Sequence, residues 1–181
     1  MKFEASISLS LKLNTTIMLI PFDKMPDYAR VWVYQADRKL NDAEVQYIQQ
    51  TLDAQINNWA AHGAALVGAA TILHKRFVVV AVDENHNQVS GCSIDASTNW
   101  LKNLGAEMNL NFFDRSVAYI QDDEIKTVEM LKIKALVAEG IITSDTLIFN
   151  NLVPNMDEFK KVWNVSAGES WMKRYFQNVV A

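Results

Sequence analysis

The stretch "VSGCSIDAST" (residues 89–98) contains the only cysteine of the chain and the residue types best suited to covalent chemistry. Cys92 lies shortly before an expected helix, whose unpaired N–H groups and dipole favour a thiolate. With Asp95 and His86 it forms a weak catalytic candidate, centred on Ser90–Asp95. The alternative is structural, because free cysteine is among the most commonly buried residue types and no Cys-x-x-Cys partner exists. We favour the structural interpretation.

The short oxygen side chains around Cys92 are best explained as helix caps. Side chains of this type accept hydrogen bonds from the first N–H groups of a helix, and four of them occur here: Ser93, Asp95, Ser97 and Thr98. We also consider Ser93 a candidate ligand-binding residue.

The three histidines, His62, His74 and His86, do not have the spacing of a metal site. The chain has neither H-x-x-x-H nor H-x-H, and it has no second cysteine to complete a ligand set. The run "DENH" is typical of a polar hairpin turn. We therefore expect no metal and no cofactor.

A candidate binding surface lies on the expected strand "ARVWVYQA" (29–36). Period-2 alternation places Arg30, Trp32 and Tyr34 on one face of this strand. Residues of these three types dominate the energetics of protein interfaces, so the row could contact a partner. The alternative is that helices of the same chain cover it, since aromatic residues also dominate cores. The C-terminal "ESWMKRYF" has the same two interpretations, a docking helix or a last piece of core.

Phosphate and nucleic-acid binding are not indicated. The sequence contains no G-x-x-x-x-G-K-[ST], no G-x-G-x-x-G and no G-x-S-x-G. Seventeen Lys and Arg against 21 Asp and Glu give a net charge of −4, so the basic footprint of a nucleic-acid binder is missing.

These residues must be positioned by a mixed set of helices and strands. Apolar periodicity predicts helices at 42–61, 96–107 and 124–140, with one or two short helices in the C-terminal tail. An Asn41–Glu44 capping box begins the first helix, and Asp122 and Asp123 are expected to cap the third. Strands are predicted at 29–36, 66–73, 77–82, 89–94, 116–121 and 145–150. The expected fold is α+β, a largely antiparallel mixed sheet of about five to six strands with helices mainly on one face.

The domain organisation is expected to be simple. Half of the residues are hydrophobic and no linker or repeat interrupts the chain, which favours one domain over residues 18–181. Residues 1–17 are an expected N-terminal extension, with Met18 as a candidate start. The apolar run there is repeatedly broken by polar residues, unlike an export signal, and a lone cysteine fits a reducing compartment. We expect a soluble cytoplasmic protein without membrane insertion.

Three runs of the chain, "ARVWVYQADRKLNDAEV", "LHKRFVVVAVDENHNQVSGCSIDAS" and "TLIFNNLV", resemble a family of small uncharacterised bacterial proteins often labelled "ABC transporter ATPase". The likeness covers about residues 20–175. It implies a bacterial source and, through the label, ATP hydrolysis. The sequence departs from the label, because the Walker A residues that hold phosphate have no counterpart and "NVSAGES" matches the ATPase signature loop poorly. We therefore expect family membership without ATPase activity.

Two functions follow as hypotheses. The first is a non-catalytic interaction or small-ligand-binding domain, whose partner is an unknown protein, a small molecule or a second copy of the chain. The second is a thiol-dependent or otherwise unrecognised enzyme centred on Ser90–Asp95. The failure of every catalytic signature favours the first.

Overall fold

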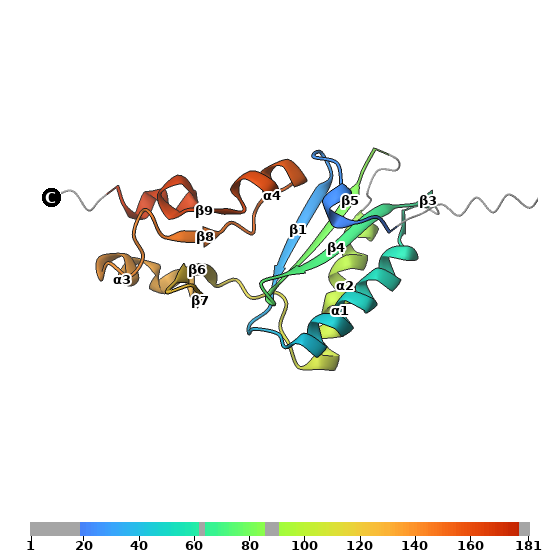
Figure 1. The fold of residues 1–181 in the computed structure, drawn as a ribbon, viewed down its shortest axis with the longest axis horizontal. Helices are drawn as coiled ribbons and strands as arrows, with labels where there is room; N and C mark the ends of the chain where they lie inside the picture. The colour runs from blue at the N-terminus through green and yellow to red at the C-terminus, as the bar shows by residue number, and fades with distance from the viewer. Residues whose placement is uncertain (1–18, 62–63, 86–90, 178–181) are drawn as a thin grey trace, which may run out of the picture.

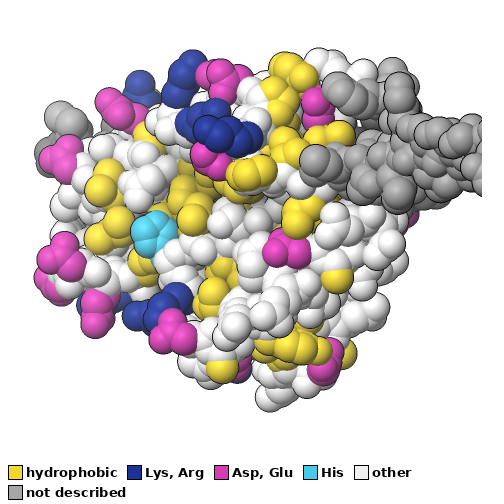
Figure 2. All heavy atoms as spheres, turned by 45° about the vertical axis from the view of Figure 1, so that its right-hand side comes forward, with side chains coloured by type: hydrophobic (Ala, Val, Ile, Leu, Met, Phe, Trp, Pro, Cys, Tyr) yellow, Lys and Arg dark blue, Asp and Glu magenta, His cyan; other side chains and the backbone are white. Residues whose placement is uncertain are grey.

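The computed structural model describes residues 19–61, 64–85 and 91–177, arranged as two antiparallel sheets with helices around them (Figure 1). Figure 2 shows one face of the molecule, on which Lys and Arg side chains stand beside Asp and Glu side chains. Hydrophobic side chains reach this face in several separate groups. No helix in the described part of the chain is long and apolar enough to cross a membrane.

The first sheet has the strand order β1-β5-β4, with β1 over Arg30–Gln35, β4 over Val67–Leu73 and β5 over Phe77–Asp83. Both neighbours pair with β5 in antiparallel register. The central strand is apolar on both faces, and all seven of its residues are buried. The prediction of these three strands is confirmed.

Two helices, α1 (Asp42–Asn57) and α2 (Gly91–Met108), cover one face of this sheet (Figure 1). The predicted capping box of α1 is confirmed: the Glu44 N–H donates to Asn41 Oδ1 at 2.9 Å, and the Asn41 N–H donates to Glu44 Oε2 at 2.8 Å. The helix ends at Asn57, earlier than predicted, because the alanines that follow pair in a short hairpin of β2 (Ala60–Ala61) and β3 (Ala64–Ala65).

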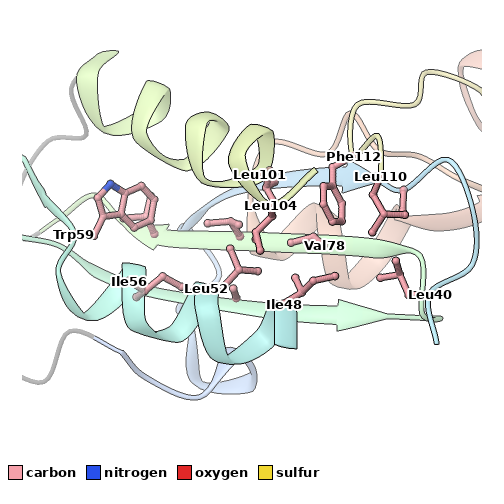
Figure 3. Close-up of a cluster of buried hydrophobic side chains, with 14 of the residues drawn as sticks. Leu40, Ile48, Leu52, Ile56, Trp59, Val78, Leu101, Leu104, Leu110 and Phe112 are labelled. Carbon is pink, nitrogen blue, oxygen red and sulfur yellow. The ribbon is translucent and has the colours of Figure 1, made fainter. Parts of the chain in front are cut away.

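The core between the helices and the sheet is made by residues at helical spacing (Figure 3). Ile48, Leu52 and Ile56 of α1 are fully buried against the strands and against Leu101 and Leu104 of α2. The opposite face of the sheet is covered by a second cluster that includes Val31 and Val79, with Met156 from α4 (Met156–Val162). The 3₁₀ turn η1 (Phe22–Lys24) adds Phe22 to this side.

The strand predicted at 89–94 is wrong. Residues 89 and 90 lie outside the described residues, and α2 already begins at Gly91, so it starts earlier than the helix predicted at 96–107. The physical reason lies in the sheet. Strands β1 and β4 occupy both edges of β5, so a further strand after β5 has no free edge of this strand to pair with.

The second sheet has the order β7-β6-β8-β9 and is also antiparallel. Its strands are β6 (Val117–Gln121), β7 (Glu124–Val128), β8 (Leu147–Phe149) and β9 (Asn164–Ser166). Short helical segments pack around it: η2 (Met130–Lys132), α3 (Ile133–Ala138), η3 (Ala167–Glu169) and η4 (Trp171–Tyr175).

The helix predicted at 124–140 is wrong over its first half. Residues 124–128 form β7, and only Ile133–Ala138 are α-helical. Asp122 and Asp123 do not cap a helix; with φ angles of 53° and 59° they form the two-residue turn of the β6–β7 hairpin. Aspartate tolerates this left-handed conformation, and "EIKTV" is rich in β-branched residues that favour a strand.

The two sheets are joined through residues distant in sequence. Isolated bridges pair Arg30 with Asn155 and Gln35 with Phe113. The rings of Phe77 and Phe149, one from each sheet, lie 4.7 Å apart within a shared hydrophobic cluster. The predicted α+β class is confirmed, with its strands divided between two sheets.

Candidate functional site

A cleft of about 630 Å³ opens where the two sheets meet. One side is formed by the end of β1 and the segment 112–117 that leads into β6. The other is formed by Met130, by the turn after β8 and by η4. Cavities of this size are typical of small-molecule sites, which also concentrate at junctions between packed units.

The polar floor of the cleft is centred on Gln35, a residue that is only 2% exposed to solvent. Its Nε2 donates to Asp114 Oδ2 at 3.0 Å and to the Ser116 carbonyl at 2.9 Å. Its Oε1 accepts from Asn151 Nδ2 at 3.0 Å, and Asn151 Oδ1 accepts from Trp163 Nε1 at 3.1 Å. Every hydrogen-bonding group of the Gln35 side chain is thus engaged, which fixes the floor before any ligand arrives.

Asp114 is held as a carboxylate by its neighbours. Partial burial by itself raises its pKa, but hydrogen bonds from Ser116 and Gln35, with the charge of Arg76, outweigh it, so the pKa lies below its ordinary value. The Ser116 N–H donates to Oδ1 at 2.9 Å while Gln35 donates to Oδ2. Both carboxylate oxygens therefore already have protein partners.

The walls of the cleft are largely apolar and partly open to solvent. Phe113, Met130 and Leu152 are 37%, 43% and 78% exposed. Phe113 is oriented by an edge-to-face contact with Tyr34, with ring centroids 5.7 Å apart. An apolar ligand in the cleft would remove these side chains from water, which is the main source of affinity in such sites.

Two guanidinium groups, those of Arg115 and Arg174, also line the cleft. Arg174 lies over the rings of Trp171 and Tyr175, at 5.7 Å and 5.1 Å from the ring centroids. Its Nη2 donates to the Tyr175 hydroxyl at 3.4 Å. Arg115 is exposed, and neither arginine forms an ion pair with any acidic residue among those described.

The predicted binding row of Arg30, Trp32 and Tyr34 lies on the face of β1 that α1 and α2 cover. Trp32 and Tyr34 pack partly buried against the helix-side core, and the Tyr34 hydroxyl lies 3.3 Å from Ser97 Oγ of α2. Arg30 remains exposed, 5.1 Å from the Trp32 ring and 3.4 Å from Glu84 Oε1. Of the three, only Tyr34 lines the cleft. Contact of this row with a partner stays a prediction.

The other predicted site residues are not among the described residues that line the cleft. Cys92 and Ser93 lie in the first turn of α2, and the structure does not describe their side chains. His86 lies outside the described residues. Asp95 is exposed on the same helix. The convergence of Cys92, Asp95 and His86 stays a prediction.

A second hollow, of about 430 Å³, lies between the β4–β5 and β6–β7 hairpin turns. Its lining includes His74, Lys75 and Arg76 from one turn and Asp123 and Glu124 from the other, so charges of both signs face it. Within the described ranges no group of three or more potential ligands is close enough to hold a metal ion. The apolar walls make the larger cleft the stronger candidate.

Sequence reasoning missed most of the cleft. Gln35, Asp114 and Asn151 carry no catalytic motif, and the floor forms only when three segments meet. One signal is present: "ESWMKRYF", interpreted above as a docking helix or a last piece of core, supplies Trp171 and Arg174 to the lining. The Asp-x-Ser spacing of Asp114 and Ser116 also indicates the local turn seen here.

Comparison with known proteins identifies no relative of this chain. No protein-family model matches the chain, and no curated protein or solved structure matches it.

Proposed function

We propose that this chain is a non-catalytic ligand-binding protein, and that its ligand is a small, largely apolar molecule held in the cleft between the two sheets. The observation that carries the proposal is the combination of exposed apolar walls with a polar floor whose groups are already hydrogen-bonded to one another. A floor of this kind is rigid, and rigid sites bind without the cost of ordering their side chains.

The walls and floor also favour binding over catalysis. Among the described residues of the lining Asp114 is the only carboxylate, and each of its oxygens already accepts a hydrogen bond, from Ser116 or from Gln35. The pKa of Asp114 lies below its ordinary value, and a carboxylate with a lowered pKa is a weaker general base. The described residues of the cleft lining include no histidine, cysteine or lysine.

We further propose that the protein belongs to the bacterial family it resembles and does not hydrolyse ATP. No Walker A sequence is available to cradle phosphates. Purified protein with millimolar ATP and magnesium should release no phosphate above a blank. Turnover would contradict this part of the proposal.

The cleft is tested with N-phenyl-1-naphthylamine, a neutral probe whose fluorescence rises in an apolar site. The wild-type protein should give a saturable rise. Met130→Asp places a charge in the cleft wall and should weaken binding about tenfold, the effect of losing roughly 1.4 kcal/mol of apolar contact.

The matched control is Leu131→Asp. Leu131 is adjacent in sequence, is 94% exposed and does not line the cleft, so the same charge there should leave probe binding unchanged. Absence of saturable binding to the wild type, or equal losses in both variants, would contradict the proposal. Circular dichroism of all three proteins checks that the fold is retained.

A further inference from the structure

We infer that the ligand of the cleft carries a carboxylate on its apolar body, and that Arg115 and Arg174 bind this group; the inference rests on the proposed function of the cleft. The chain has a net charge of −4, yet the described residues of the cleft lining include two arginines and one aspartate, two positive charges against one negative. A local excess of positive charge at a cleft attracts anions even when the whole molecule is acidic.

The negative charge in the lining is already compensated. Asp114 Oδ1 and Oδ2 accept from Ser116 and Gln35, and Arg76 contributes an opposing charge. Each carboxylate oxygen of Asp114 therefore already accepts a hydrogen bond within the floor of the cleft. The two cleft arginines, in contrast, have no acidic partner within the described part of the chain.

Arg174 is held in place without being neutralised. The faces of Trp171 and Tyr175 lie against its guanidinium, and the Tyr175 hydroxyl accepts one hydrogen bond at 3.4 Å. Contacts with aromatic rings orient the group and leave other N–H donors available. A guanidinium presents its donors as a planar fork that matches a carboxylate.

The apolar walls determine the rest of the ligand. Phe113, Met130 and Leu152 offer an exposed apolar surface beside the arginines. A ligand that satisfies both features has a compact aromatic or branched apolar body and one acidic group. A single negative charge suits the site better than a doubly charged phosphate, because the net charge of −4 of the whole chain disfavours the approach of a second negative charge.

The test is competition against N-phenyl-1-naphthylamine by two molecules with the same ring system. 2-Naphthoate is an anion at pH 7, and 2-naphthalenemethanol is neutral. The wild type should bind naphthoate about tenfold more tightly, the usual advantage of a charge-assisted hydrogen bond pair. Raising the salt concentration should reduce this preference, because the arginines are partly exposed.

The double variant Arg115→Gln/Arg174→Gln should bind 2-naphthoate and 2-naphthalenemethanol about equally well. Its affinity for the neutral compound should be unchanged. Arg174→Lys keeps the charge and should restore part of the preference lost in Arg174→Gln. Lys173→Gln removes the same charge from the neighbouring, exposed position of η4, which does not line the cleft, and should leave the preference unchanged.

The outcomes separate the two proposals. If the wild type binds the probe but shows no preference for naphthoate, or if 2-naphthyl phosphate competes more strongly than naphthoate, the inference is overturned and the proposed function stands. If neither the probe nor either competitor binds, the proposed function itself fails.

Discussion

Asn151 and Gln35 are 116 positions apart in the chain, and the Asn151 side-chain amide donates to Gln35 Oε1 at 3.0 Å. This hydrogen bond joins the turn after β8, in the second sheet, to the end of β1, in the first. It continues through Asp114 on one side and Trp163 on the other. The contact between the sheets is therefore polar as well as hydrophobic, and it forms the floor of the cleft.

Gln35→Leu should lower the free energy of unfolding by about 1–3 kcal/mol, because it leaves partly buried groups of Asp114 and Asn151 without their partner. Combining it with Asn151→Leu should cost less than the sum of the single changes, with a coupling of about 1–2 kcal/mol. Urea denaturation of the wild type, the two single variants and the double variant measures this coupling.

Gln121→Leu, at the end of β6, is the control and should change the free energy of unfolding by less than about 0.5 kcal/mol. Strict additivity would contradict the network.

The capping box of α1 should make a pH-dependent contribution to the free energy of unfolding. Hydrogen bonds from Arg38 and from the Asn41 backbone lower the pKa of Glu44 to about 2. The group therefore stabilises the fold fully above its unfolded pKa of about 4.3, and this contribution disappears as the pH falls toward 2. Glu44→Gln should be less stable than wild type at pH 7, by a few tenths of a kcal/mol up to about 1 kcal/mol for an ion pair at the surface.

The measurement is urea denaturation of both proteins at several pH values between 7 and 2. The difference should be constant above about pH 5 and close to zero near pH 2. Glu139→Gln, an exposed change at the end of α3, is the control and should show no such trend. A difference that grew as the pH fell would contradict the assignment.

The backbone conformation of the turn between β6 and β7 indicates that a substitution there should stabilise the fold. Asp122 and Asp123 both have positive φ, a conformation that Asn-Gly adopts more readily. Asp122→Asn/Asp123→Gly should raise the free energy of unfolding by about 0.5–1 kcal/mol. The exposed contact of Lys126 with Asp122, at 3.8 Å, is lost at little cost.

Asp122→Asn/Asp123→Ala serves as the control for this turn, because it removes the same two charges but places at position 123 an alanine, which disfavours positive φ. It should be destabilising, and thermal denaturation of both variants gives the comparison. If the alanine variant were as stable as the Asn-Gly variant, turn conformation would not be the cause.

The sequence predicted those elements whose local signals agree with their neighbours. The run "FVVVAV" indicated a strand buried on both faces, and β5 is central with every residue buried. The Asn41–Glu44 spacing indicated the start of α1. In both cases the pattern and the tertiary environment favour the same structure.

Other elements depended on contacts that local patterns do not contain. The segment 124–140 has helical spacing, but pairing of β7 with β6 through a left-handed Asp-Asp turn overrides it. The cleft was missed for a similar reason. Its floor needs Gln35, Asp114 and Asn151 to meet from three separate segments, and hydrogen-bonding side chains of these types are common throughout soluble proteins.

The most direct test of the cleft as a binding site is the indole N–H region of a ¹⁵N NMR spectrum during titration with 2-naphthoate or its neutral alcohol. Trp171 lines the cleft, whereas Trp59 is buried in the helix-side core (Figure 3). The Trp59 ring lies 5.0 Å from the ring of Trp100. We predict a saturable shift of the Trp171 resonance with no change at Trp59, and loss of the shift in Met130→Asp. A titration that moved the Trp59 resonance and left Trp171 unchanged would contradict the account.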